Sequence, residues 1–367
     1  MSDVVLALNA GSSTLKYALY RCENGAEHEL TSATLPMHGS ASAAVLDALL
    51  ARLPAPEMAT ITRVGHRLVH GGEHTAPLAV DRATLARLHA LAPLAPLHLP
   101  PALELLEAAL QRLPAALHVA CFDTAFHRDL PEVARRLSLP LELHERGIRR
   151  YGFHGLSYQY VLSVLGEPAP ARLVIAHLGS GASLAAVLRG RCIDTSMGFT
   201  PSGGIPMGTR SGDLDPGVLL YLQRTQGWSR EQLEQLVDHE AGLLGVGGSA
   251  DMQDLLAREA AGDARAKLAV AWFAYALKKQ IGAYVAALGG LDCLVFTGGI
   301  GEHAARVREL CCNNLAVLGI ELDAEQNASN APLIGRPGAA CQVRVIATDE
   351  DRMICRATLA LARSVQA

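Results

Sequence analysis

The chain has 367 residues, half of them apolar, and a formal net charge of -4 at pH 7. This length accommodates two domains, because single hydrophobic cores usually stop growing at about 250–300 residues. Acidic and basic residues are mixed along the chain without a long basic run, which argues against nucleic acid and membranes as partners.

The N-terminal segment MSDVVLALNAGS carries an early acid and no basic stretch, and no run of about 18 apolar residues occurs. The eight cysteines form no C-x-x-C pair and lie mostly in apolar surroundings, which predicts buried thiols and no structural zinc. We therefore expect a cytoplasmic protein without a signal peptide.

Hydrophobic periodicity predicts alternating strands and helices, a pattern typical of α/β architecture. The predicted strands are 4–9, 16–20, 61–69, 117–120, 173–178, 183–188, 294–297 and 343–346. The predicted helices are 81–91, 101–113, 156–165, 216–226, 229–239, 263–288, 304–318 and 350–363. The helix at Ser229 begins with Ser-Arg-Glu-Gln, a capping-box pattern.

A Gly-Ser turn joins the first two predicted strands, within LALNAGSSTLKYALY. It is not a P-loop, because no second glycine precedes Lys16 and the residues after the turn alternate as a strand does. Such a turn either cradles phosphate with its backbone N–H groups or simply reverses the chain. The segment IAHLGSGASLAAVL repeats the pattern about half a chain later, which favours duplicated domains.

The composition changes near the charged stretch LPLELHERGIRR. We therefore expect an N-terminal domain at 1–150 and a C-terminal nucleotide-binding domain at 151–351. The C-terminal helix, 352–367, is expected to return to the first domain.

Arg67, Asp123, His154 and Arg210 lie in segments dense in functional side chains and glycine. Three of them have an ordinary structural explanation: a surface arginine at Arg67, a cap of the following segment at Asp123, and a core histidine at His154. Together with Lys16 and the Gly-rich turns, they suit phosphoryl transfer, which needs positive charge around the phosphate oxygens. Arginine matches phosphate or carboxylate with two parallel hydrogen bonds.

The chain resembles the acetate kinase family along nearly its whole length. The segments that carry the resemblance occur in the family's order: NAGSSTLK, GHRLVHGG, LAPLH, FDTAFH, YGFHG, SMGFTP, MGTRSGD, AGLLGVGGSADM, TGGIGE and ATDE. The resemblance implies two duplicated ribonuclease-H-like domains of the actin, hexokinase and Hsp70 type, with a cleft between them, and a homodimer. It also implies reversible transfer of the ATP γ-phosphoryl group to acetate, giving acetyl phosphate and ADP.

Carried over by position, the resemblance implies a role for each matching residue. Asn9 and Glu350 match the positions associated with Mg²⁺, for which Mn²⁺ is the alternative ion. Asp123, His154, Arg210 and Arg67 match the catalytic positions, with Arg67 holding the substrate carboxylate. Asp123 is expected to orient the substrate, because a carboxylate nucleophile near neutral pH has no proton to remove.

The substrate-binding and nucleotide-binding sets follow in the same way. The acyl pocket is expected at Arg67, Val69, Leu97, Phe153 and Pro201, and a valine at 69 resembles acetate-preferring members. The nucleotide-binding residues are expected to be Ser12, Thr14, Lys16, His177, Leu178, Gly179, Ser180, Gly181, Asp251, Met252, Gln253, Gly299, Ile300, Gly301, Glu302 and His303.

Four departures from the family pattern touch mainly the nucleotide side. Ser180 replaces a usual Asn, Leu99 replaces the Asn of LHNP, Gln253 replaces a common Arg, and TPSGGIPMG replaces TPLEG. Two alternatives to an acetate kinase therefore stay open. One is a kinase for propionate or another short acyl group; the other is a low-turnover protein that binds nucleotide or acyl phosphate.

Overall fold

A computed structural model describes residues 3–11, 14–37 and 41–366. The chain divides into two compact units. Unit 1 comprises Met1–Arg128, Phe153–Tyr160 and Asp349–Ala367, and unit 2 comprises Asp129–Gly152 and Val161–Thr348. The domain limits expected from the sequence, 1–150 and 151–351, stay a prediction.

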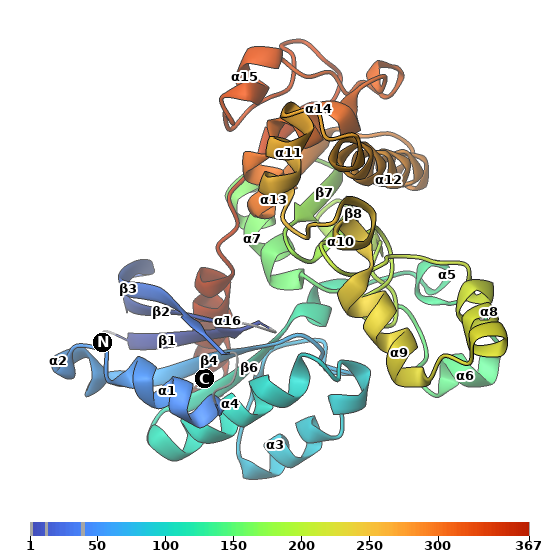
Figure 1. The fold of residues 1–367 in the computed structure, drawn as a ribbon. Helices are drawn as coiled ribbons and strands as arrows, with labels where there is room; N and C mark the ends of the chain where they lie inside the picture. The colour runs from blue at the N-terminus through green and yellow to red at the C-terminus, as the bar shows by residue number, and fades with distance from the viewer. Residues whose placement is uncertain (1–2, 12–13, 38–40, 367) are drawn as a thin grey trace. The chain divides into compact units, whose positions relative to one another are not determined.

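Unit 1 contains a six-stranded sheet in the order β3-β2-β1-β4-β6-β5. Its strands are β1 (Asp3–Ala10), β2 (Thr14–Glu23), β3 (Ala26–Pro36), β4 (Ile61–Leu68), β5 (Leu78–Ala79) and β6 (Leu117–Phe122). Its helices are α1 (Ser42–Leu50), α2 (Ala55–Met58), α3 (Arg82–His89), α4 (Leu99–Arg112) and α16 (Glu350–Gln366), and helix α7 (Gly155–Leu165) begins there (Figure 1).

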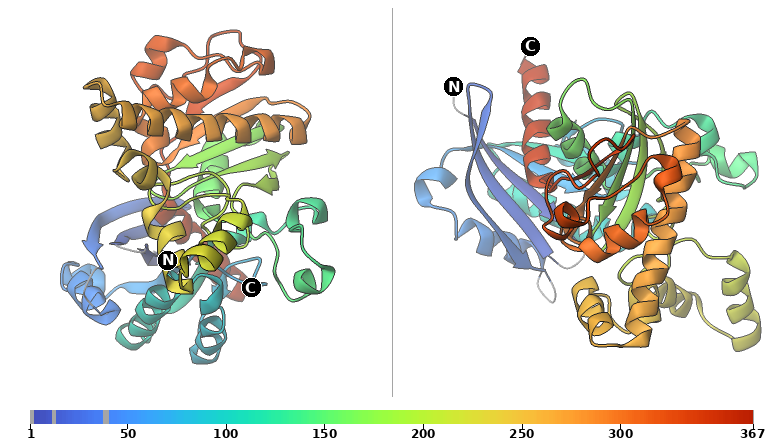
Figure 2. Two further views of the ribbon diagram at one scale, coloured as in Figure 1. Left: turned by 45° about the vertical axis from the view of Figure 1, so that its right-hand side comes forward. Right: turned by 90° about the horizontal axis from the view of Figure 1, so that it is seen from above.

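Unit 2 contains a five-stranded sheet in the order β11-β10-β7-β8-β9. Its strands are β7 (Arg172–Leu178), β8 (Ala182–Leu188), β9 (Arg191–Thr195), β10 (Cys293–Thr297) and β11 (Gln342–Val345). Its helices are α5 (Glu132–Arg135), α6 (Leu141–Glu145), α8 (Pro216–Gln226), α9 (Arg230–Gln235), α10 (Gly242–Gly247), α11 (Met252–Ala260), α12 (Ala264–Leu288), α13 (Gly298–His303), α14 (Ala305–Cys312) and α15 (Ala324–Ala328). The long helix α12 packs along β7 and β8 (Figure 2).

The two sheets repeat one arrangement. In unit 1, β3, β2 and β1 are antiparallel neighbours, and β1, β4 and β6 are parallel. In unit 2, β9, β8 and β7 are antiparallel, and β7, β10 and β11 are parallel. The repeated hairpin predicted from the sequence is thus confirmed: β1 pairs with β2, and β7 pairs with β8.

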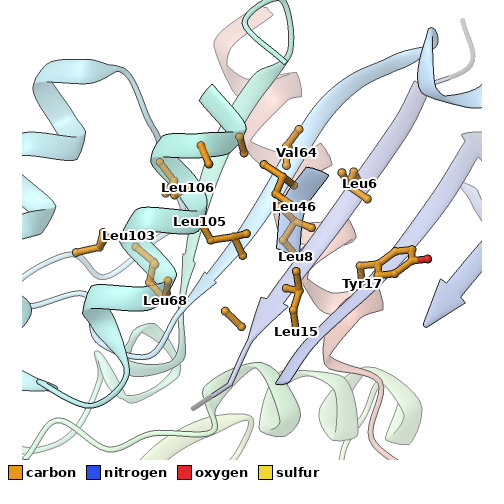
Figure 3. Packing of buried hydrophobic residues seen from close by; sticks show 14 of the residues in the cluster. Leu6, Leu8, Leu15, Tyr17, Leu46, Val64, Leu68, Leu103, Leu105 and Leu106 are labelled. Atoms are coloured by element: carbon orange, nitrogen blue, oxygen red, sulfur yellow. The ribbon is translucent and has the colours of Figure 1, made fainter. Parts of the chain in front are cut away.

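The two faces of the unit 1 sheet are buried by different helices because side chains alternate along each strand. Leu6 and Leu8 of β1 point into a cluster with residues of α1 and α4, such as Leu46 and Leu106 (Figure 3). On the other face, Val5 and Ala7 pack with Ile354 and Leu359 of α16. The C-terminal helix therefore belongs to the core of unit 1.

All eight predicted strands are present, but three strands were missed. The longest missed strand, β3, lies at the sheet edge, and its sequence AEHELTSATLP is largely polar because most of its residues are not buried. The single helix predicted at 304–318 is wrong: α14 ends at Cys312, and Asn314 adopts the left-handed φ of 62°, which breaks the helix.

The capping box at Ser229 is confirmed, although regular α9 stops at Gln235 and a π-helical turn follows. All eight cysteines are free and buried, as most were predicted to be. Among the described residues, no helix is both long and apolar enough to cross a membrane.

Candidate active site

A polar cluster of unit 1 forms where parallel strands end. Asn9 lies near the end of β1, Arg67 near the end of β4, and Asp123 directly after β6. The carboxyl ends of parallel strands meet at one sheet edge, which is where α/β proteins bind ligands. Glu350 and Asp351, in the first turn of α16, join them although they are more than 200 residues away in the chain.

Arg67 is the centre of this cluster. Its Nε lies 3.2 and 3.1 Å from the two carboxylate oxygens of Asp123, and its Nη2 lies 2.7 Å from Oδ2. Its Nη1 donates to the Oδ1 of Asn9 at 2.9 Å and lies 3.0 Å from the Oε2 of Glu350. The planar guanidinium thus fixes one carboxylate with a fork and reaches a second one.

The two partners of this fork are protected from water to different degrees. The Asp123 side chain is fully buried and that of Arg67 is 14% exposed. Burial raises the pKa of the Asp123 carboxyl above its ordinary value, and the Arg67 guanidinium opposes that rise. Burial lowers the pKa of Arg67, but the carboxylates of Asp123 and Glu350 outweigh this and raise it, so the guanidinium stays charged.

Asn9 links the arginine to the acidic end of α16. Its Nδ2 donates to Glu350 Oε2 at 3.1 Å and to Asp351 Oδ1 at 3.0 Å. Burial raises the pKa of Asp351 to about 6, while the hydrogen bond from Asn9 opposes the rise. Asp351 was not among the predicted site residues. It lies in the acidic run TDED, where an acidic residue in the first turn of a helix is common because it complements the helix dipole.

The possible metal ligands at this site are the carboxylate oxygens of Glu350 and Asp351 and the amide oxygen of Asn9. Mg²⁺ prefers oxygen ligands. In the described part of the chain, no group of three or more His, Cys, Asp or Glu residues could hold a metal ion alone. Mg²⁺ usually keeps several waters and binds through one or two carboxylates plus substrate phosphates. Glu350, with Asp351 and Asn9 beside it, therefore fits a water-rich Mg²⁺ site and not a closed metal cage.

The segment from Phe153 to Gly155 lies against Asp123. A Cβ on Gly155 would come within 1.9 Å of the Asp123 backbone oxygen, so only glycine permits this approach. His154, directly before it, adopts the left-handed φ of 58°, which is uncommon outside glycine. Buried Phe153 packs edge-on to His70 with ring centroids 5.6 Å apart. His154 therefore lies between two residues, Phe153 and Gly155, that are held in place by packing.

Two residues of the first hairpin adjoin the cluster. Lys16 is exposed on β2, directly across from Asn9, and its charge acts on the carboxyl of Asp351. Thr14 accepts a hydrogen bond from the Gly11 N–H at its carbonyl, at 2.8 Å. Ser12 lies outside the described residues.

The remaining acyl-pocket residues differ in burial and in the unit to which they belong. Val69 is buried, directly after β4, whereas Leu97 is 42% exposed. Leu99, one of the departures, is buried in the core of unit 1. Pro201 belongs to unit 2, where its carbonyl accepts from Arg210 Nη1 at 3.1 Å.

Arg210 is held in a glycine-rich loop of unit 2. Gly204 and Gly212 adopt left-handed φ values of 89° and 68°, and added Cβ atoms would meet backbone atoms at 2.5 and 2.6 Å. Burial lowers the pKa of Arg210, and the charge of Asp238 opposes this effect. The loop is thus a tightly packed structure and not a linker.

Unit 2 also contains a pocket of about 830 Å³ that collects half of the predicted nucleotide-binding residues. The turn after β7, the start of α11 and helix α13 form its walls. Eight predicted residues line it: Gly179, Ser180, Asp251, Met252, Gln253, Gly299, Ile300 and His303. Ala250, Leu256 and Ala304 line it as well and were missed, because small and apolar residues carry no motif.

Five predicted nucleotide-binding residues of unit 2 do not line this pocket: His177, Leu178, Gly181, Gly301 and Glu302. Glu302 instead accepts two backbone hydrogen bonds on Oε1, from the N–H of Gly298 at 2.9 Å and of Thr348 at 3.2 Å. Asp251 lines the pocket but also caps α11 by accepting from the Gln253 N–H at 2.8 Å.

Comparison with known proteins identifies the family of this chain. Residues 21–356 match the Acetokinase family. An acetate kinase of Rhodopseudomonas palustris is 43% identical over 97% of this chain and 98% of that protein. A propionate kinase of Citrobacter rodentium is also 43% identical, over 99% of this chain and 98% of that protein.

Among solved structures, a propionate kinase from Francisella tularensis superposes with a TM-score of 0.88 at 35% identity, covering 98% of this chain and 99% of that chain. Such agreement defines an α/β phosphotransferase with the duplicated actin- and hexokinase-like fold. The chain belongs to the acetokinase family.

Proposed function

We propose that this protein is an acetate kinase that transfers the γ-phosphoryl group of ATP to acetate and also catalyses the reverse reaction. The observation that carries the proposal is the Arg67 fork, which fixes Asp123 and Asn9 at the strand ends of unit 1. Membership of the acetokinase family and the pocket of unit 2 support it.

In the proposed reaction, one acetate oxygen attacks the γ-phosphorus, a new O–P bond forms, and the bond to the bridging oxygen of ADP breaks. Arg67 binds the acetate carboxylate beside Asp123, which orients the guanidinium. Acetate is already ionised near neutral pH, so Asp123 has no proton to accept from it.

Charge builds up on the phosphoryl oxygens during transfer, and cationic side chains lower the barrier. We assign this role to Arg210 and His154, with Lys16 and the pocket of unit 2 holding the nucleotide. Thr14 and Ser12 belong to the same phosphate-binding turn in this proposal. When bound at Glu350, Asp351 and Asn9, Mg²⁺ supplies positive charge beside the donor phosphates.

A propionate kinase is the second candidate, since relatives carrying that name are as similar as those named acetate kinase. Val69 favours acetate, because its two methyl groups occupy space that a smaller side chain would leave to propionate. A difference of one methylene changes kcat/KM by only about 10- to 200-fold, so both acids are expected to react, at different rates.

The proposal extends to a homodimer in the cytoplasm. Helix α8 has no buried residue, and its Val218, Leu220 and Tyr221 are 43%, 55% and 55% exposed, which suits an interface with a second copy of the chain. Eight free thiols suit a reducing compartment.

The test is the formation of acyl phosphate, trapped with hydroxylamine, from acetate, propionate and butyrate. Each acid is combined with MgATP, MgGTP or magnesium pyrophosphate. The proposal predicts acetyl phosphate with MgATP and the highest kcat/KM for acetate. Higher kcat/KM for propionate would favour the second candidate. No product with any donor, together with measurable MgADP binding, would favour a nucleotide-binding protein of low turnover.

A further inference from the structure

Arg308, on α14, is the largest fully buried side chain of the described residues. Its guanidinium makes five hydrogen bonds. Nε donates to Asn327 Oδ1 at 2.8 Å, and Nη2 donates to the Asn327 carbonyl at 2.8 Å and to Asn330 Oδ1 at 2.6 Å. Nη1 donates to the carbonyls of Gly301 at 2.8 Å and Glu302 at 3.0 Å.

All five acceptors are neutral. Burying a charge is costly unless it is paired and hydrogen-bonded, and within the described residues no carboxylate forms an ion pair with Arg308. Burial accordingly lowers its pKa. If Arg308 only joined α14 to α15, well-packed apolar side chains could do the same. Its five hydrogen bonds therefore call for a more specific explanation.

The carbonyls of Gly301 and Glu302 belong to α13, the short helix whose Gly299 and Ile300 line the pocket of unit 2. Arg308 therefore fixes the end of α13 that lies away from these two residues. Glu302 fixes the other end, because its Oε1 accepts from the Gly298 N–H. Arg308 and Glu302, which do not line the pocket, thus fix the position of α13 in the pocket wall.

We propose that Arg308 is a positioning residue for nucleotide binding: it holds α13 in place so that Gly299 and Ile300 contact the nucleotide. This inference rests on the proposed function, since it presumes that the pocket binds ATP and ADP. It predicts that damage to the Arg308 bonds weakens nucleotide affinity in the folded protein while acetate recognition, which we assign to unit 1, stays intact.

The main test is Arg308→Lys, which keeps the charge and loses the fork. We expect the Kd for MgADP and the KM for MgATP to rise about 10- to 100-fold, the range that corresponds to losing a hydrogen bond to a charged group. The KM for acetate should stay within about twofold of wild type, a change at the level of ordinary context dependence. Binding is measured by isothermal titration calorimetry on protein whose folding is verified by circular dichroism.

Asn330→Gly is the milder companion variant. It removes one acceptor of Arg308, and glycine keeps the left-handed backbone found at Asn330, where φ is 53°. We expect a smaller rise in the MgADP Kd in the same direction. If Arg308→Lys does not fold, this variant decides the question.

Arg172→Lys is the matched control. Arg172 binds Asp292 and the Gly289 carbonyl at the start of β7, whereas the pocket residue Gly179 follows the end of that strand. The Arg172→Lys variant should have a lower melting temperature than wild type and an unchanged Kd for MgADP. Wild-type affinity for MgADP in both Arg308→Lys and Asn330→Gly would overturn the inference and leave the proposed function intact. A wild-type protein that binds no MgADP would overturn both.

Discussion

At the scale of single residues, the polar cluster of unit 1 depends on the shape of one guanidinium. Arg67 contacts Asp123, Asn9 and Glu350 at once, and its planar fork suits carboxylates in a way that an ammonium group does not. The same guanidinium is the one assigned to the acetate carboxylate, so its substitution should affect acetate before anything else.

The first prediction is therefore that Arg67→Lys lowers kcat/KM for acetate by about 10²- to 10³-fold, the usual effect of losing one stabilising contact in the transition state. The MgADP Kd should stay unchanged, because the pocket assigned to ADP lies in unit 2. Steady-state kinetics and calorimetry measure the two quantities. Arg63→Lys, on the same strand and paired with Asp3, serves as control and should keep wild-type kinetics. Equal kinetics in the two variants would contradict the role assigned to Arg67.

The second prediction concerns Val69, which is buried directly after β4. Val69→Ala removes two methyl groups and should raise the ratio of kcat/KM for propionate to that for acetate by about tenfold or more, the lower range for one methylene. Parallel assays with both acids measure the ratio. An unchanged ratio would mean that Val69 does not face the acyl chain.

At the scale of secondary-structure elements, the site depends on how closely α16 approaches β4. A Cβ on Gly65 would lie 2.3 Å from Thr358 Oγ1 and 2.5 Å from Ile354 Cγ2, so only glycine allows this contact. The same helix presents Glu350 and Asp351 to Asn9. Helix packing and the acidic part of the site are thus mechanically linked.

The third prediction is that Gly65→Ala lowers the free energy of unfolding by about 1–3 kcal/mol, as overpacking does, and raises the Mg²⁺ concentration needed for half-maximal activity. Chemical denaturation and Mg²⁺ titration of the activity measure these effects. Gly282→Ala is the control, since Gly282 lies within α12 with no atom near its added Cβ. That variant should be as stable as wild type or more so, because alanine favours helices by about 1 kcal/mol over glycine. A stable Gly65→Ala protein with normal Mg²⁺ dependence would refute the link.

Strands β4 and β6 carry a second paired feature, the buried histidines His66 and His118. His118 Nε2 lies 3.0 Å from the Leu113 carbonyl and must donate to it, so its Nδ1 accepts from His66 Nε2 at 3.1 Å. Burial lowers the pKa of His66 well below its ordinary value and also lowers the pKa of His118.

The fourth prediction follows from the sign of these shifts. The unfolded chain takes up protons on both histidines below their ordinary pKa of about 6.5, whereas the folded protein does not, so stability falls as the pH decreases. Denaturant titrations at pH 7.5 and 5.5 should show this pair contributing a loss of about 2 kcal/mol. His118→Gln should reduce the dependence of the free energy of unfolding on pH, whereas substitution of the exposed His28 by Gln should not. Identical slopes in His118→Gln and wild type would exclude the pair as the cause.

At the scale of the whole molecule, the sequence predicts the two hairpins, every parallel strand and the strand-end residues Arg67 and Asp123. These features are local, since alternation and strand ends are visible in short windows. The edge strand β3 lacks this signal because most of its residues are not buried. Arg308 was missed for the opposite reason: its burial and its five partners depend on residues up to 22 positions away.

The role of Glu350 could be predicted only from the resemblance to a family. Nothing local to ATDED indicates that a helix 341 residues downstream of Asn9 returns to the same sheet edge. The contact exists because α16 supplies the apolar face that covers Val5 and Ala7. Long-range burial, and not the motif itself, thus completes the acidic part of the site.

The last prediction concerns assembly. Val218 and Tyr221 are three residues apart on α8, lie on one side of it and are 43% and 55% exposed. If α8 covers its counterpart in a second copy, Tyr221→Glu buries a charge in an apolar contact and should convert a dimer into a monomer. Sedimentation equilibrium distinguishes the 38.8 kDa chain from a species of twice that mass. Gln226→Glu adds the same charge at the exposed end of the helix and should leave the dimer intact. A wild-type protein that sediments as a monomer at micromolar concentration would remove the homodimer from the proposed function, and a dimer that survives Tyr221→Glu would move its interface away from α8.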